Sequence, residues 1–220
     1  MGDIRYIILH HSATDYQLND KDKTGEEIAK VICRRARERW TKENPKYDYK
    51  CDYHFLIGHT GKVFEGQPID RPAWHATNYH VNMHSIGICF LGNFEKIKMP
   101  IEQFNAGVKL IKPLVKEYHI PLKNILRHKD VISDITHHTN STLCPGKNFP
   151  YIEMLEAVRN GEPFLDIGND YPYLKELKYL KANGIIKGDA SGCFNPDYYI
   201  TREETALIAY RLLKLIMQNR

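Results

Sequence analysis

Hydrophobic and polar residues alternate along the first 160 residues in blocks that predict strands and helices in turn. Residues 5–9 and 85–91 are short apolar runs typical of buried strands. Residues 25–40 place apolar side chains on one helical face, at Ile28, Ile32, Ala36 and Trp40. This alternation predicts an α/β fold with a central mixed β-sheet flanked by helices.

The middle of the chain continues the pattern. Residues 52–65 predict two strands joined by a turn at Gly61. Residues 101–118 predict a long amphipathic helix, which Pro113 should kink or locally interrupt. A short last helix is expected over residues 151–159.

The pattern changes in residues 161–220, which we predict to form a second, small and mainly helical domain after a first domain of residues 1–160. One helix is expected near residues 173–182. Another should begin at Thr201, where Glu204 completes a capping box. So small a core would gain stability by packing against the first domain or against further copies in a homo-oligomer.

Composition narrows the class of protein. Hydrophobic residues make up 42% and charged residues 26%, as in ordinary globular proteins. No apolar run approaches the roughly 20 residues that cross a bilayer, and the N-terminus lacks the regions of a signal peptide. The net charge of +4 is mild and is explained more simply by a solvated surface than by an anionic partner. We expect synthesis in the cytoplasm, no membrane and no nucleic acid.

Five cysteines are scattered without a C-x-x-C pair, at positions 33, 51, 89, 144 and 193. Their odd number and spacing argue against a disulfide framework or a structural zinc finger. We expect Cys33 and Cys89 to be buried as small apolar residues and Cys51 to be structural. At least one thiol should be free or bound to a ligand.

Candidate chemistry lies where polar residues follow apolar strands. His10 ends the first strand, His128 follows a short apolar stretch, and Cys144 lies in a Pro-Gly loop. Two imidazoles and a thiolate suit zinc with an open fourth position, which lowers the pKa of a bound water to roughly 7. Eleven histidines, however, allow many such triples.

Seven ordered motifs resemble the type-2 N-acetylmuramoyl-L-alanine amidases, the superfamily of phage lysozyme-type amidases and peptidoglycan recognition proteins. They span residues 6–14, 52–57, 74–76, 82–88, 91–94, 128–131 and 142–146. The resemblance covers residues 3–160 and implies a zinc cleft on the mixed sheet.

The resemblance also implies roles for individual residues. Zn²⁺ would be held by His10, His128 and Cys144, and peptidoglycan would be the substrate. Tyr53 and Thr142 would be catalytic, steadying an oxyanion or positioning the attacking water. Two further positions, His75 and Asn82, would line the substrate groove. No carboxylate is an obvious base, although Glu65 is nearest by motif order.

One spacing departs from the family. The second metal histidine usually precedes the cysteine by about eight residues, whereas His128 precedes Cys144 by sixteen. His137 and His138 in the longer loop have nearly the expected spacing and remain alternatives. We prefer His128 because it carries the His-Lys-Asp-Val motif.

The tail resembles a single S-layer homology motif over residues 164–216. Its relatives contact anionic secondary cell-wall polysaccharide through a segment matching Thr201-Arg202-Glu203-Glu204. The alternative is a stabilising appendage without a ligand. Together the two resemblances imply a phage or prophage endolysin that acts on the wall after release. A host autolysin and a non-catalytic peptidoglycan-binding protein are the alternatives.

Overall fold

A computed structural model describes residues 3–15, 25–43, 46, 48–132, 142–159, 163–164, 166–167, 171–189 and 193–218. The chain divides into two compact units. The first comprises Met1–Ile120 with Asn124–Val158, and the second comprises Pro121–Lys123 with Arg159–Arg220. The alternatives at positions 137 and 138 lie outside the described residues.

The first unit contains a five-stranded mixed sheet in the order β3-β2-β4-β1-β5. Strand β1 (Tyr6–His11) pairs in parallel with the central strand β4 (Ser85–Phe90) and with the edge strand β5 (Ile125–Arg127). Towards the other edge β2 (Phe55–Ile57) is parallel to β4 and antiparallel to β3 (Val63–Glu65). The predicted mixed α/β sheet is therefore confirmed.

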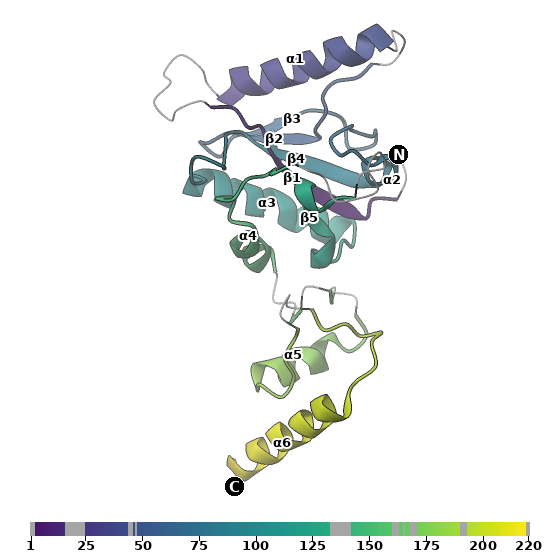
Figure 1. Cartoon of the computed structure of the whole chain (residues 1–220), viewed down its shortest axis with the longest axis vertical. Coiled ribbons are helices and arrows are strands. Elements are labelled where there is room, and N and C mark those ends of the chain that lie inside the picture. Colours follow the sequence, from purple (N-terminus) through teal and green to yellow (C-terminus); the bar gives the residue numbers. More distant parts are fainter. Residues whose placement is uncertain are drawn as a thin grey trace. The chain divides into compact units, whose positions relative to one another are not determined.

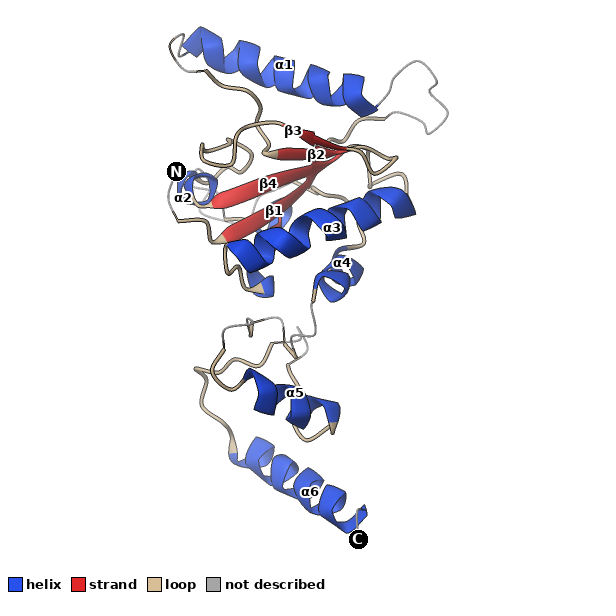
Figure 2. Ribbon diagram, turned by 180° about the vertical axis from the view of Figure 1, so that it is seen from behind, coloured by secondary structure: helices blue, strands red, loops and turns tan. Residues whose placement is uncertain are grey.

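Helices cover both faces of this sheet. Figure 1 and Figure 2 show α1 (Gly25–Glu43) on one side and α3 (Ile101–Glu117) with α4 (Tyr151–Val158) on the other. Shorter elements are α2 (Tyr79–Met83), η1 (Leu122–Asn124) and η2 (His128–Asp130). Helix α3 continues unbroken through Pro113, so the expected interruption does not occur. Pro113 is exposed, and water can bond the carbonyl that it leaves without a donor.

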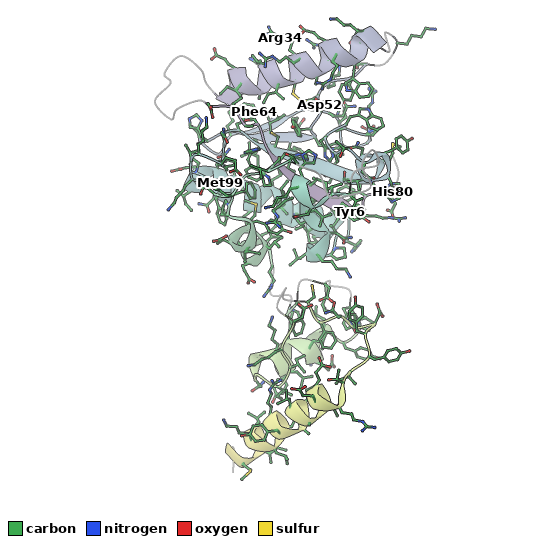
Figure 3. All side chains as sticks on the ribbon, in the orientation of Figure 1. Tyr6, Arg34, Asp52, Phe64, His80 and Met99 are labelled. Atoms are coloured by element: carbon green, nitrogen blue, oxygen red, sulfur yellow. A yellow bond between two sulfur atoms is a disulfide. The ribbon has the colours of Figure 1, made fainter. Side chains whose placement is uncertain are left out.

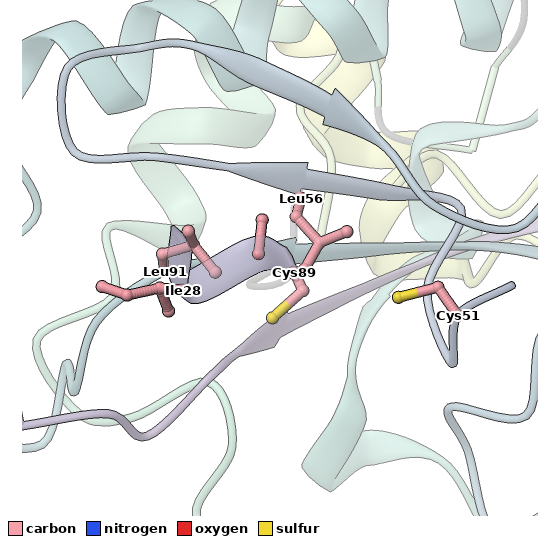
Figure 4. Packing of buried hydrophobic residues seen from close by; sticks show 6 residues of the cluster. Ile28, Cys51, Leu56, Cys89 and Leu91 are labelled. Atoms are coloured by element: carbon pink, nitrogen blue, oxygen red, sulfur yellow. The ribbon is translucent and has the colours of Figure 1, made fainter. Parts of the chain in front are cut away.

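The amphipathic face predicted for α1 packs on the sheet. Ile28 is buried there with Leu56, Cys89 and Leu91 (Figure 4). Arg34 is exposed on the outer face of the helix (Figure 3). The spacing of apolar residues thus predicted both the helix and its buried face.

The expectation for Cys33 was wrong, whereas Cys51 has the structural role expected of it. Cys33 on α1 is not a thiol but forms a disulfide with Cys51, across a Cα–Cα distance of 4.3 Å. The bond joins α1 to the segment that leads into β2. Its cause is the packing of α1 on the sheet, which brings together two positions that a spacing of 18 residues does not identify.

The second unit contains α5 (Leu174–Ala182) and α6 (Arg202–Gln218) around a small core formed by Phe164, Ile167, Leu177, Ile185 and Ile186. The predicted capping box is present at the start of α6. The Glu204 amide donates to Thr201 Oγ1 at 3.1 Å, and the Thr201 amide donates to Glu204 Oε2 at 2.8 Å.

None of the helices in the described part of the chain combines the length and apolar character needed to span a membrane.

Candidate metal centre

Three side chains converge at the carboxyl ends of the parallel strands. His10 lies at the end of β1, His128 begins η2 directly after β5, and Cys144 lies in the loop before α4. Because β1 and β5 are parallel neighbours, the side chains that follow them meet at one edge of the sheet. Their candidate ligand atoms all lie within 4.8 Å of one another. Within the described residues no other group of three His, Cys, Asp or Glu side chains does so.

The geometry identifies which nitrogen of His10 faces the cluster. Its Nδ1 lies 3.8 Å from the Cys144 sulfur, and the rings of His10 and His128 are 4.6 Å apart between centroids. His10 is almost completely buried, with 1% of its surface exposed. Its Nε2 points away from the cluster, towards the protein interior.

The loop carrying Cys144 is fixed by its backbone. The amide of Cys144 donates to Thr142 Oγ1 at 3.1 Å, and its carbonyl accepts from the Lys129 amide at 3.0 Å. Gly146 has a φ of +101°, and a Cβ there would lie 2.5 Å from the carbonyl carbon of Phe94. Only glycine fits this position, which explains why Gly146 follows Cys144 and Pro145.

His11 contributes through its backbone, as expected for a residue whose side chain points to the other face of β1. Its amide donates to the sulfur of Cys144 at 3.4 Å. Its Nδ1 instead accepts a hydrogen bond from the Phe94 amide at 3.2 Å.

Burial sets the protonation states of the cluster. It lowers the pKa of His10 well below the usual value and that of His128 to about 4. It raises the pKa of the Cys144 thiol to about 11, although the His11 amide acts in the opposite direction. Both imidazoles are therefore neutral, with lone pairs available at neutral pH. A divalent cation would compensate the charge of a Cys144 thiolate, so two nitrogens and one sulfur fit zinc.

Two residues expected at the substrate groove are buried, and one of them, His75, contacts the cluster. His75 Nδ1 lies 3.0 Å from His10 Nε2, and His75 Nε2 lies 3.2 Å from Ser85 Oγ. Asn82 bonds the backbone of Ala76 twice, accepting at 2.9 Å and donating at 2.6 Å. These contacts give both residues structural partners, and their contact with substrate stays a prediction.

The two expected catalytic residues lie beside the cluster. The Tyr53 ring is 5.1 Å from that of His10 between centroids, and burial raises the pKa of its hydroxyl well above the usual value. The nearby Cys89 and Cys144 side chains shift this pKa in the same direction. Thr142 is partly buried next to Cys144. Glu65, the nearest acid by motif order, is exposed on β3.

Sequence reasoning missed Ser85 and Cys89. Both lie on β4 in register with β1, Ser85 opposite Tyr6 and Cys89 opposite His10. Side chains in register on neighbouring strands share a face of the sheet. The sequence feature that could have identified them is the alternation Ser-x-Gly-x-Cys along β4, which places these residues on one face of the strand. It becomes informative only once the pairing of β4 with β1 is known.

The sequence model of the N-acetylmuramoyl-L-alanine amidase family matches residues 1–147, and that of the S-layer homology domain matches residues 163–206. One peptidoglycan-recognition protein of Drosophila melanogaster is 29% identical over 147 residues, which are 66% of this chain and 70% of that protein. A second from the same species, peptidoglycan-recognition protein SC2, is 38% identical over 97 residues, 44% of this chain and 47% of that protein.

Solved structures show the same fold. The N-acetylmuramoyl-L-alanine amidase LysC from Clostridium intestinale matches with a TM-score of 0.55 and 24% identity, over 71% of this chain and 86% of that one. The endolysine amidase LysCS from the same organism matches with a TM-score of 0.51 and 25% identity, over 71% and 84% of the two chains.

Proposed function

Because the chain belongs to the N-acetylmuramoyl-L-alanine amidase family, followed by an S-layer homology domain, we propose that it is a zinc-dependent peptidoglycan hydrolase. The bond cleaved would be the amide between N-acetylmuramic acid and L-alanine. The observation that carries the proposal is the convergence of His10, His128 and Cys144, whose donor atoms lie within 4.8 Å.

Zinc held by these three residues would act as a Lewis acid and make water nucleophilic at neutral pH. The chain supplies the conditions for holding it. Burial keeps His10 and His128 neutral, so that each offers a lone pair. The His11 amide, 3.4 Å from the Cys144 sulfur, stabilises negative charge on that atom.

In this proposal the hydroxyl groups of Tyr53 and Thr142 would assist the reaction. The Tyr53 ring lies against His10, and its raised pKa keeps the hydroxyl protonated as a hydrogen-bond donor. Thr142 Oγ1 accepts from the Cys144 amide, which leaves the hydroxyl proton of Thr142 to be donated elsewhere. Each donor would stabilise the oxyanion that develops on the scissile carbonyl, by about 2–4 kcal/mol in comparable sites.

The test is digestion of purified muropeptides followed by mass analysis of the products. Peptides beginning with L-alanine, together with sugars bearing a free lactyl group, are expected from the wild-type chain. Cys144→Ala should abolish both the products and the bound zinc, while His119→Asn serves as a control. His119 is exposed with a φ of +51°, which asparagine tolerates. Hydrolysis that survives Cys144→Ala or exhaustive chelation would refute the proposal.

The relatives named peptidoglycan-recognition proteins suggest a second candidate, binding of peptidoglycan without cleavage. The Cys144 thiol favours hydrolysis, because it completes a three-ligand set. The same digestion separates the two functions. Retention of the chain on insoluble peptidoglycan without any released product would support the binding protein.

For the biological role we propose a phage or prophage endolysin that reaches the wall after release from the cytoplasm. The likeness to the endolysine amidase LysCS, at 25% identity, supports this role over that of a host autolysin. Purified protein added to intact Gram-positive cells should reduce their turbidity. Impaired division of a host strain lacking the gene, without any effect on phage release, would favour the autolysin.

The second unit would hold the enzyme on the wall by binding anionic secondary cell-wall polysaccharide. A pocket of about 430 Å³ in this unit is lined by Lys187, Thr201, Glu204 and Arg211, among others. Lys187 is exposed, so its ammonium is available to an acidic sugar. Lys187→Ala should weaken co-sedimentation with purified walls but leave cleavage of soluble muropeptides unchanged. Equal sedimentation of wild type and variant would favour a purely stabilising role for this unit.

A further inference from the structure

We propose that His75 is a positioning residue that fixes the orientation and the tautomer of His10, and that Ser85 in turn holds His75. The inference rests on the proposed role of His10 as a metal ligand. It concerns a residue expected to line the substrate groove.

Three buried side chains form a continuous line behind the metal centre. His10 Nε2 and His75 Nδ1 are 3.0 Å apart, and the second nitrogen of His75 is 3.2 Å from Ser85 Oγ. The exposed fractions of the three residues are 1%, 7% and 0%. Buried polar atoms need partners, and these three supply them to one another.

The chemistry of the cluster selects one arrangement of protons along this line. His10 Nδ1 faces the Cys144 sulfur at 3.8 Å, so this nitrogen needs a lone pair to bind a metal. A neutral imidazole carries a single N–H, which must then be on Nε2 and donate to His75 Nδ1. The proton of His75 is consequently on its Nε2 and donates to Ser85 Oγ. A metal-bound histidine whose other N–H is held in this way is a more basic and better oriented ligand.

The backbone of β4 makes room for the His75 ring. A Cβ at Gly87 would lie 2.4 Å from His75 Cδ2, so the ring occupies the space of a side chain at that position. His54 packs edge-on against the ring, at 6.1 Å between centroids, and its Nδ1 accepts from the Gly87 amide at 2.9 Å. The ring is thus confined between β4 and His54 and cannot follow His10 if that residue turns.

Two substitutions of His75 separate the hydrogen bond from packing. Asparagine places its side-chain carbonyl near the position of Nδ1 and can accept from His10. Glutamine reaches the position of Nε2, so it can meet Ser85 but not His10. If His75 only fills space, the two variants should behave alike. If it positions His10, they should differ.

The experiment is titration of each purified full-length chain with zinc in competition with a chromogenic chelator. His75→Gln should weaken zinc binding by about 10- to 100-fold, the range for loss of a residue that supports a ligand. His75→Asn should keep most of the affinity, and the His119→Asn control should keep all of it. In the cobalt-substituted protein, His75→Gln should also alter the intensity of the visible d–d bands, which report ligand geometry.

The outcomes separate this inference from the proposed function. No zinc binding by the wild-type chain would overturn the metal centre itself. Tight wild-type binding with equal affinities for the asparagine and glutamine variants would overturn only the role of His75. Should His75→Gln fail to fold, Ser85→Ala replaces it. A weaker affinity in Ser85→Ala would support the line of hydrogen bonds, and an unchanged one would overturn it.

Discussion

Gly87 and His75 are in such close contact that a Cβ added to the glycine would lie 2.4 Å from Cδ2 of the histidine. Position 87 is in register with Ile8 on β1, two residues before His10, and therefore lies beneath the metal centre. The absence of a side chain on β4 is what allows an imidazole to lie flat behind His10. The space that the His75 ring requires explains why position 87 is a glycine.

Gly87→Ala should therefore damage the metal centre without altering any candidate ligand. The added methyl group must displace the His75 ring, and His10 with it, so we expect zinc affinity to fall at least tenfold. Overpacking should also lower the free energy of unfolding by about 1–3 kcal/mol. Zinc titration and urea unfolding measure the two effects. Gly58→Ala is the matched control, because its Cβ would be no closer than 3.4 Å to any neighbour. Unchanged zinc affinity in Gly87→Ala would contradict the arrangement.

Features of the fold and of the metal centre could be predicted where the residues that form them lie close together in the sequence. The capping box of Thr201 and Glu204 is local, with its partners three positions apart, and was predicted correctly. The helical face of α1 is encoded by its own periodicity. The ends of the parallel strands were recognisable as a site because His10 and His128 follow apolar runs, although their pairing came from a family resemblance.

The remaining features depend on contacts between distant segments. The partner of His10 is 65 residues away, at His75. Nothing in either local sequence indicates the contact, because it follows from strand register and from the glycine on β4. The bond between Cys33 and Cys51 likewise follows from how α1 lies on the sheet. For this reason the contact of His75 with His10 was not predicted, and the expected thiol at position 33 proved to be a disulfide.

The disulfide should be a measurable part of the stability of the first unit. It closes a loop of 18 residues, for which restriction of the unfolded chain contributes about 3 kcal/mol. Cys33→Ser should lower the free energy of unfolding by about that amount in the absence of reductant. Urea unfolding monitored by tryptophan fluorescence provides the measurement. With reductant present, wild type and variant should unfold at nearly the same urea concentration, and a difference that persists would point to packing at position 33 instead.

The cap of α6 can be tested within one helix. Thr201→Ala removes the oxygen that accepts from the Glu204 amide, and loss of such a cap costs about 1 kcal/mol. Amides in the first turn of α6 should then exchange with deuterium several-fold faster. Thr205→Ala is the control, since alanine favours the helix interior and the Thr205 hydroxyl only bonds back to the Thr201 carbonyl. Equal exchange rates in the two variants would argue against the cap.

His54 should make the stability of the metal-free protein depend on pH. Burial lowers its pKa to about 4, although its hydrogen bond to the Arg71 carbonyl acts in the opposite direction. The unfolded chain takes up this proton near pH 6.5, whereas the folded chain does so only near pH 4. The free energy of unfolding should therefore be unaffected above pH 6.5 and fall below it, by up to about 3 kcal/mol from this group by pH 4.

The variant that isolates this contribution is His54→Asn. Its side-chain oxygen can still accept from the Gly87 amide, but it has no proton to gain. Other buried histidines near the metal centre also have lowered pKa values, so they too make the free energy of unfolding fall as the pH falls. The informative quantity is therefore the difference between the wild-type protein and His54→Asn. Urea unfolding at pH 7 and pH 5 should show a smaller loss of stability in the variant. Parallel profiles would mean that His54 is protonated equally in both states, which would contradict its role as an acceptor for Gly87.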